Sequence, residues 1–174
     1  MEKTTVKKNK KTRKLSKDLR KQLFETGLER LCDWADKRGW ITDFSYTCED
    51  EMEPGNKMIY INTRQSVEKQ LYSMIHECGH VLVQSNVKAY YKKYPATAES
   101  RFLGVGRMRK LEKTKKYKID TIAEEIEAWD RGKKLARRLE LYINEDNYTK
   151  LMYECVYTYV DWAARGKSGD GKRS

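Results

Sequence analysis

Residues 66–84, Ser-Val-Glu-Lys-Gln-Leu-Tyr-Ser-Met-Ile-His-Glu-Cys-Gly-His-Val-Leu-Val-Gln, decide the fold. His76 and His80 are four residues apart, so on a helix they would lie one turn apart on the same side. The opposite side of that helix would hold the apolar residues Val67, Leu71, Met74, Cys78, Val81 and Leu82. The stretch therefore predicts a helix with one face in the core and another face that carries two imidazoles.

The same stretch contains a metal-binding pattern. With Glu77 between them, the histidines form H-E-x-x-H, in which both imidazoles bind one metal ion and the glutamate reaches the metal-bound water. They are the only two histidines of the chain, so a third protein ligand must be Asp, Glu or Cys. Cys78 falls on the core face, which favours a buried apolar role over metal binding or nucleophilic catalysis. We therefore expect a carboxylate.

Residues 124–129, Glu-Glu-Ile-Glu-Ala-Trp, offer three glutamates. On a helical wheel Glu125 lies on the apolar face, whereas Glu124 and Glu127 point to the opposite side. An ionised carboxylate on a buried face is unfavourable unless it is paired or bound to a metal. Glu125 is therefore the predicted third ligand, and pairing with Arg or Lys, or exposure at the helix edge, is the alternative interpretation.

Taken together, His76-Glu77-x-x-His80 and Glu125-x-x-Ala128 resemble the gluzincin metallopeptidases, most of all the small ImmA/IrrE-type and phage-encoded zincins. The resemblance covers about residues 16–143. The chain departs from that pattern at Trp129, where Asp or Asn usually stands. The resemblance implies a peptidase whose Zn²⁺ is held by His76, His80 and Glu125.

In the implied mechanism, Glu77 takes a proton from a zinc-bound water that attacks the peptide carbonyl. A tyrosine could donate a second hydrogen bond to the oxyanion, and the sequence does not select among Tyr117, Tyr153 and Tyr157. The resemblance also implies an edge strand above the motif helix that pairs with extended peptide substrate. Residues 58–62 are the candidate for this strand.

The remaining pattern predicts a mainly helical, zincin-like α+β fold with a small antiparallel sheet packed by the motif helix. Apolar periodicity predicts further helices over about 16–38, 120–142 and 146–164. Alternation over 44–48, turn residues at 54–56 and a β-prone run over 58–61 predict a hairpin. Residues 86–117 are basic and contain Pro95, Gly104 and Gly106, which indicates a long loop.

The predicted organisation is a single domain over residues 16–164. It follows a disordered basic arm over residues 1–15 and precedes a flexible tail over 165–174. Four cysteines without a C-x-x-C pair, and the absence of an apolar leader, favour a reducing cytoplasm, the host's if the protein is phage-encoded. No apolar run approaches the ~20 residues that span a bilayer, so no membrane partner is expected.

The net charge of +11 is concentrated in two segments. Residues 1–21 hold ten Lys/Arg against two acidic residues, and residues 88–118 hold eleven against two. Tyrosines interleave with lysines over 90–94, an arrangement that could stack on bases and contact phosphates. The alternative function is therefore a nucleic-acid-binding or regulatory module with a zincin-like core, or a peptidase that acts on DNA-associated proteins. A solvated basic loop is the competing interpretation.

Overall fold

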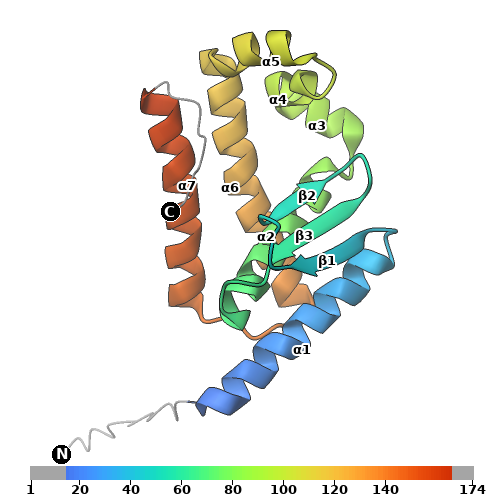
Figure 1. Ribbon diagram of the computed structural model, residues 1–174, viewed down its shortest axis with the longest axis vertical. Helices are drawn as coiled ribbons and strands as arrows, with labels where there is room; N and C mark the ends of the chain where they lie inside the picture. The colour runs from blue at the N-terminus through green and yellow to red at the C-terminus, as the bar shows by residue number, and fades with distance from the viewer. Residues whose placement is uncertain (1–14, 166–174) are drawn as a thin grey trace, which may run out of the picture.

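The computed structural model describes residues 15–165. The predicted arm before residue 15 and the predicted tail after residue 165 lie outside the described residues. Within them the chain runs in the order α1 (Lys17–Asp36), β1 (Ile41–Ser45), β2 (Glu51–Glu53), β3 (Met58–Asn62), α2 (Val67–Gln84), α3 (Val87–Lys93), α4 (Pro95–Ser100), α5 (Val105–Glu112), α6 (Lys115–Arg138) and α7 (Glu145–Arg165) (Figure 1). No helix over residues 15–165 is both long and apolar enough to cross a membrane.

The four long helices agree with the predicted ones, and side-chain caps set where three of them begin. The Ser16 hydroxyl accepts a hydrogen bond from Leu19 N at the start of α1, and the Ser66 hydroxyl caps α2 in the same way. Helix α6 begins five residues earlier than predicted because Thr114 caps it. It ends at Arg138, shortly before Glu140 takes a positive φ of 52°.

The sheet is mixed, so the prediction of a purely antiparallel sheet is wrong in this respect. Its strand order is β1-β3-β2, with β1 parallel and β2 antiparallel to β3. The hairpin exists, but its first strand is β2, and the predicted first strand over 44–48 overlaps the end of β1. Alternating polarity indicates a strand without fixing its partner or direction.

The central place of β3 overturns a second prediction. Residues 58–62 were expected to be an edge strand, yet β3 is hydrogen-bonded on both sides. Its backbone groups are therefore already paired, and β1 and β2 are the edges of the sheet.

The predicted long loop over residues 86–117 is wrong, because this segment contains three short helices and the first residues of α6. The Asn86 side chain accepts a hydrogen bond from Ala89 N and caps α3, Pro95 is the first residue of α4, and Gly104 is the N-cap of α5. Residues that often break helices therefore begin them here. Helices of six to eight residues are also too short to show a clear periodicity.

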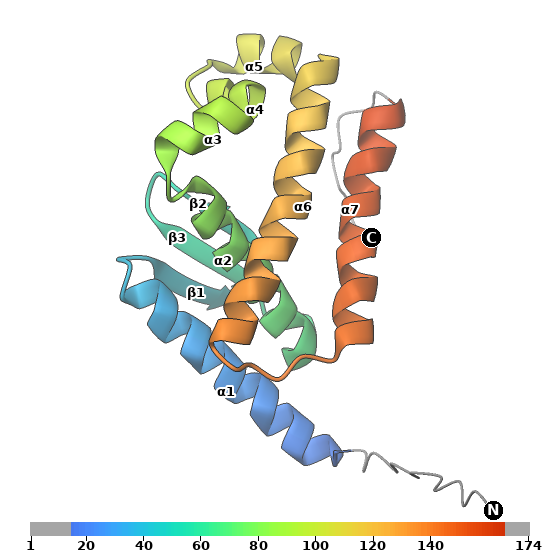
Figure 2. The same ribbon diagram turned by 180° about the vertical axis from the view of Figure 1, so that it is seen from behind.

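Helix α2 runs through the centre of the molecule, with the sheet and α1 on one side and α6 on the other (Figures 1 and 2). Ile59 and Ile61 of β3 are fully buried and share one core cluster with Leu71 and Met74 of α2. The motif helix is thus held on two sides, and its polar side chains have fixed surroundings.

Candidate metal centre

Two glycines let α2 and α6 cross with their backbones in contact. A Cβ added to Gly79 would overlap the carbonyl oxygen of Ala128, and one added to Gly132 would overlap that of Ile75. Ala128 is itself completely buried. Gly79 in the motif and Ala128, three positions after Glu125, are therefore small for a steric reason. They allow the close contact that brings Glu125 up against the histidine face of α2.

At this crossing, three predicted ligands converge. His76 Nε2 lies 3.2 Å from His80 Nε2 and 3.2 Å from Glu125 Oε2, and His80 Nε2 lies 3.5 Å from Glu125 Oε1. Tetrahedral zinc with bonds of about 2.0–2.1 Å holds its ligand atoms roughly 3.3–3.4 Å apart. The three side chains are close enough together to bind one metal ion.

The surroundings of Glu125 fit a bound cation. The residue is 8% exposed, and its Oε2 atom is buried without a hydrogen-bond partner among residues 15–165. A buried polar atom of this kind is uncommon and destabilising unless something satisfies it. Two imidazole nitrogens and a carboxylate oxygen form a donor set that suits Zn²⁺.

Glu77 and Glu125 have opposite electrostatic environments. Burial raises the pKa of Glu77, and the nearby His76 and His80 only partly oppose this. Burial also acts to raise the pKa of Glu125, but the adjacent imidazoles of His76 and His80 outweigh it and hold that pKa well below its usual range. Glu77 Oε1 lies 4.0 Å from His76 Nε2. A carboxyl group with a raised pKa beside a metal site is suited to proton transfer.

Trp129 takes the place where the resembled pattern has Asp or Asn. Its ring stacks on the His76 imidazole with the ring centroids 4.3 Å apart and the planes 20° apart. Trp129 is 2% exposed and also packs edge-on against Tyr148. The position therefore supplies a flat packing surface that restrains the His76 ring.

Glu124 is nearly buried, so its predicted outward position is wrong. It is 7% exposed, and its carboxylate accepts hydrogen bonds from Tyr90 of α3 and Gln84 of α2. Apolar periodicity indicates a single buried face of α6 and does not show which other helices cover it. Side chains of α3 contact a further side of α6, and α3 was not predicted because its sequence resembles that of a loop.

Tyr159 of α7 reaches the candidate site, although sequence reasoning did not single it out. Burial, followed by the charges of Glu125 and Glu77, raises the pKa of Tyr159. Of the tyrosines considered from sequence, Tyr153 and Tyr157 are each 65% exposed. The face of α7 that turns inward depends on its packing beside α6 (Figure 2), which no motif reports.

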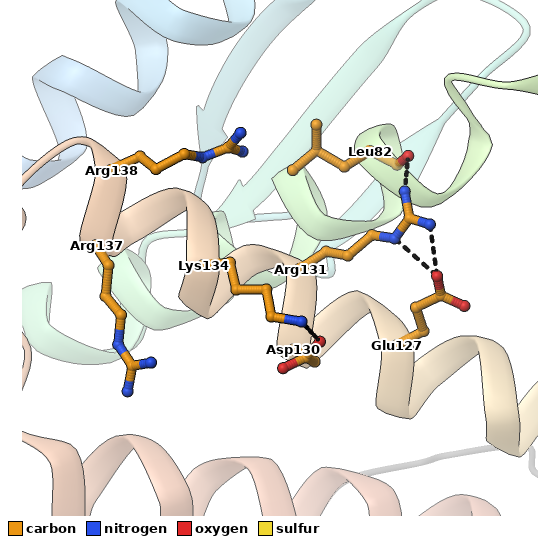
Figure 3. A pocket seen from close by; sticks show the side chains of 7 residues that line it. All are labelled: Leu82, Glu127, Asp130, Arg131, Lys134, Arg137 and Arg138. Atoms are coloured by element: carbon orange, nitrogen blue, oxygen red, sulfur yellow. Dashed lines mark hydrogen bonds and ion pairs between the residues drawn. The ribbon is translucent and has the colours of Figure 1, made fainter.

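A depression of about 700 Å³ lies on another face of α6 and contains none of the candidate ligands (Figure 3). Its basic side chains are largely committed to other groups. Arg131 pairs with Glu127 and donates to the carbonyl oxygen of Leu82, and Lys134 pairs with Asp130. At about 100° per residue, Glu127 is roughly half a turn around α6 from Glu125.

The aromatic part of the predicted nucleic-acid segment is mostly unavailable. Tyr90 and Tyr94 are 3% and 2% exposed, so they pack inside the fold and cannot stack on bases. Tyr91 is 38% exposed, and its ring lies 6.1 Å from that of the more exposed Phe102. Among the aromatic residues that the structure describes over 88–118, Tyr91 and Phe102 are the exposed ones.

Comparison with known protein families found a match to part of the chain. A peptidase family model described as IrrE N-terminal-like domain matches residues 33–103, which include the sheet and the H-E-x-x-H helix but not Glu125. Comparisons with curated proteins and with solved structures gave no match. The family match confirms the predicted resemblance of this chain to an ImmA/IrrE-type, zincin-like peptidase.

Proposed function

We propose that the protein is a zinc-dependent peptidase. The observation that carries the proposal is the convergence of His76, His80 and Glu125 beside the buried carboxyl group of Glu77. Zn²⁺ held by these three ligands would polarise a peptide carbonyl and acidify water. A structural zinc site normally has four protein ligands, so three ligands leave a position open for chemistry.

The side chains around the ligands suit the steps of peptide hydrolysis. Glu77 accepts the proton of the attacking water and passes it to the leaving amine, a role that its raised pKa favours. Tyr159 stays protonated because its pKa is raised, and it lies beside Glu125. We assign Tyr159 the hydrogen bond to the carbonyl oxygen as that oxygen gains negative charge.

An edge strand beside the site offers a place for the substrate backbone. Strand β2 is an edge of the sheet and contacts α2. Asp50, just before β2, accepts a hydrogen bond of 2.7 Å from Ser73 of α2 and adds to the charges that raise the pKa of Glu77. An extended peptide paired with β2 would therefore run close to the catalytic carboxylate. We propose that β2, and not residues 58–62, is the strand that pairs with the substrate backbone.

Cleavage of a proteome-derived peptide library, read by mass spectrometry, tests this function. The zinc-loaded protein should generate new peptide termini at reproducible sites. Glu77→Gln should bind zinc as the wild type does and lose cleavage by about 10²–10⁴-fold. Glu127→Gln, which changes a carboxylate outside the site, should cleave normally. Equal cleavage by wild type and Glu77→Gln would contradict the mechanism.

A second candidate function is electrostatic binding of nucleic acid by the segment 88–118. Its Lys and Arg side chains are largely exposed on α3, α5 and the start of α6, and Tyr91 and Phe102 lie exposed beside them. We expect binding to random-sequence DNA that weakens steeply with salt. Replacing Arg107, Arg109 and Lys110 of α5 with Gln should reduce the binding, and no binding at low salt would exclude this function.

A further inference from the structure

The two histidines of the candidate site differ at the nitrogen that faces away from it. His80 Nδ1 lies 3.7 Å from Glu124 Oε1. His76 Nδ1 is buried and has no hydrogen-bond partner among residues 15–165, and Trp129 stacks on its ring. One ring is thus held by packing, and the other ring lies next to a carboxylate.

Glu124 is fixed by neutral groups from two other helices. Tyr90 OH donates to Oε2 at 2.9 Å, and Gln84 Nε2 donates to Oε1 at 3.1 Å. No Lys or Arg forms an ion pair with Glu124 in the described part of the chain. A buried carboxylate without a cationic partner is unfavourable. The group that can offer it a charged or polarised N–H is His80.

Glu124 lies outside the ligand set itself. The Nε2 atoms of both histidines face Glu125, whereas Glu124 faces Nδ1 on the other side of the His80 ring. It is therefore placed to orient a ligand and not to bind the metal. An acceptor at Nδ1 keeps the proton there and leaves the Nε2 lone pair free for a metal ion.

We propose that Glu124 is a positioning residue that holds His80 in its metal-binding tautomer and orientation, and that Tyr90 and Gln84 hold Glu124 in place. This inference rests on the proposed function, because it requires that His80 binds a metal. It also gives α3 a role in the metal centre, since Tyr90 joins that helix to His80 through Glu124. The sequence around residue 90 shows no sign of this role.

Zinc affinity, measured by competition with a chromophoric chelator, gives the first test and needs no substrate. Glu124→Gln should weaken Zn²⁺ binding by about 10- to 100-fold. Tyr90→Phe removes only a hydroxyl group, leaves the aromatic packing intact and should weaken binding a few-fold. Glu127→Gln changes a glutamate of the same helix with no contact to His80, and its affinity should stay within twofold of wild type.

Nitrogen-15 NMR of the zinc-loaded protein gives a readout that a general loss of stability would not change. The chain has two histidines, and through-space contacts with the stacked Trp129 ring identify the His76 signals in the zinc-loaded protein. We expect the Nδ1–H resonance of His80 to shift or broaden in Glu124→Gln and in Tyr90→Phe, while that of His76 stays in place.

The outcomes separate this inference from the proposed function. If Glu125→Ala loses zinc while Glu124→Gln and Tyr90→Phe keep both wild-type affinity and the His80 resonance, the positioning role is wrong and the metal centre stands. If Glu125→Ala binds zinc as wild type does, the metal centre is wrong and the positioning role falls with it.

Discussion

Two faces of α6 carry glutamates with different kinds of partner. On the face toward α2, Glu125 lies against two imidazoles. On the face that borders the depression, Glu127 accepts hydrogen bonds from Lys93, Tyr94 and Arg131. Burial favours the neutral form of Glu127, but these partners together outweigh it and lower its pKa to about 2.

The difference separates a structural carboxylate from one available for chemistry. Lys and Arg keep their charge near neutral pH, so Glu127 remains an ion-pair partner. Imidazoles can lose their protons and then bind a metal together with the carboxylate between them. Glu124 resembles Glu125 because it also lies near an imidazole. Its neighbours are Tyr90, Gln84 and His80.

Gly79→Ala should have the largest effect, because the added methyl group would push α2 and α6 apart. Alanine usually stabilises a helix interior relative to glycine by about 1 kcal/mol. Here its Cβ would meet the Ala128 carbonyl, so we expect a loss of about 3 kcal/mol in the free energy of unfolding, together with loss of zinc binding.

Gly106→Ala is the matched control for this variant. Gly106 lies in α5 with no neighbouring atoms near its added Cβ, so the substitution should be neutral or stabilising in urea unfolding. If Gly79→Ala behaved in the same way, the backbone contact between α2 and α6 would not be what places Glu125.

Removal of zinc should affect only the face of α6 that lies toward α2 and carries Glu125. A ligand that binds only the folded chain stabilises it by about 4 kcal/mol at 1,000 times its Kd, which for a domain of this size raises Tm on the order of 10 °C. We expect a chelator to remove this stabilisation from the wild type and from Glu127→Gln. In Glu125→Ala, zinc should leave Tm unchanged, and a full zinc-induced shift there would remove Glu125 from the ligand set.

Glu127→Gln tests the other face through its dependence on pH. The folded pKa of Glu127, about 2, lies below its ordinary value of 4.5. The group therefore contributes stability that is complete above about pH 5 and is lost as the pH falls from 4.5 toward 2.

Urea unfolding measures this contribution directly. The wild type should exceed Glu127→Gln by about 1 kcal/mol at pH 7, because the Lys93 and Arg131 side chains are partly exposed and solvent screens the pairs. The difference should shrink markedly at pH 3. A difference of the same size at both pH values would show that packing, not charge, holds Glu127.

The smallest effect is expected from Lys134→Ala. Its ion pair with Asp130 is short, at 2.6 Å, but the two side chains are 65% and 57% exposed. Such pairs contribute at most about 0.5 kcal/mol. A loss above 1 kcal/mol in urea unfolding would mean that the depression of Figure 3 has a structural role that its contacts do not explain.

The parts of the fold that sequence could predict are those with local signals. Caps at Ser16 and Ser66 and the periodicity of 67–83 locate helices, and the fixed spacing of H-E-x-x-H places two histidines on one side. The choice of Glu125 also followed from local amphipathicity. Each of these signals depends on residues within a few turns of one another.

The features that sequence could not predict depend on long-range packing. The parallel pairing of β1 with β3 needs a crossover that no local pattern encodes. The burial of Glu124 needs α3, and the position of Tyr159 needs the rotation of α7 against α6. Gly79 lies within the motif, but its role in helix packing can be recognised only from its contact with the backbone of Ala128.

The zinc content of purified protein tests the central claim most directly. Elemental analysis should find about one zinc ion per chain in the wild type and in Glu127→Ala, and almost none in His80→Ala or Glu125→Ala, with all four proteins folded by circular dichroism. Stoichiometric zinc in Glu125→Ala, or none in the wild type after zinc loading, would contradict a site formed by His76, His80 and Glu125.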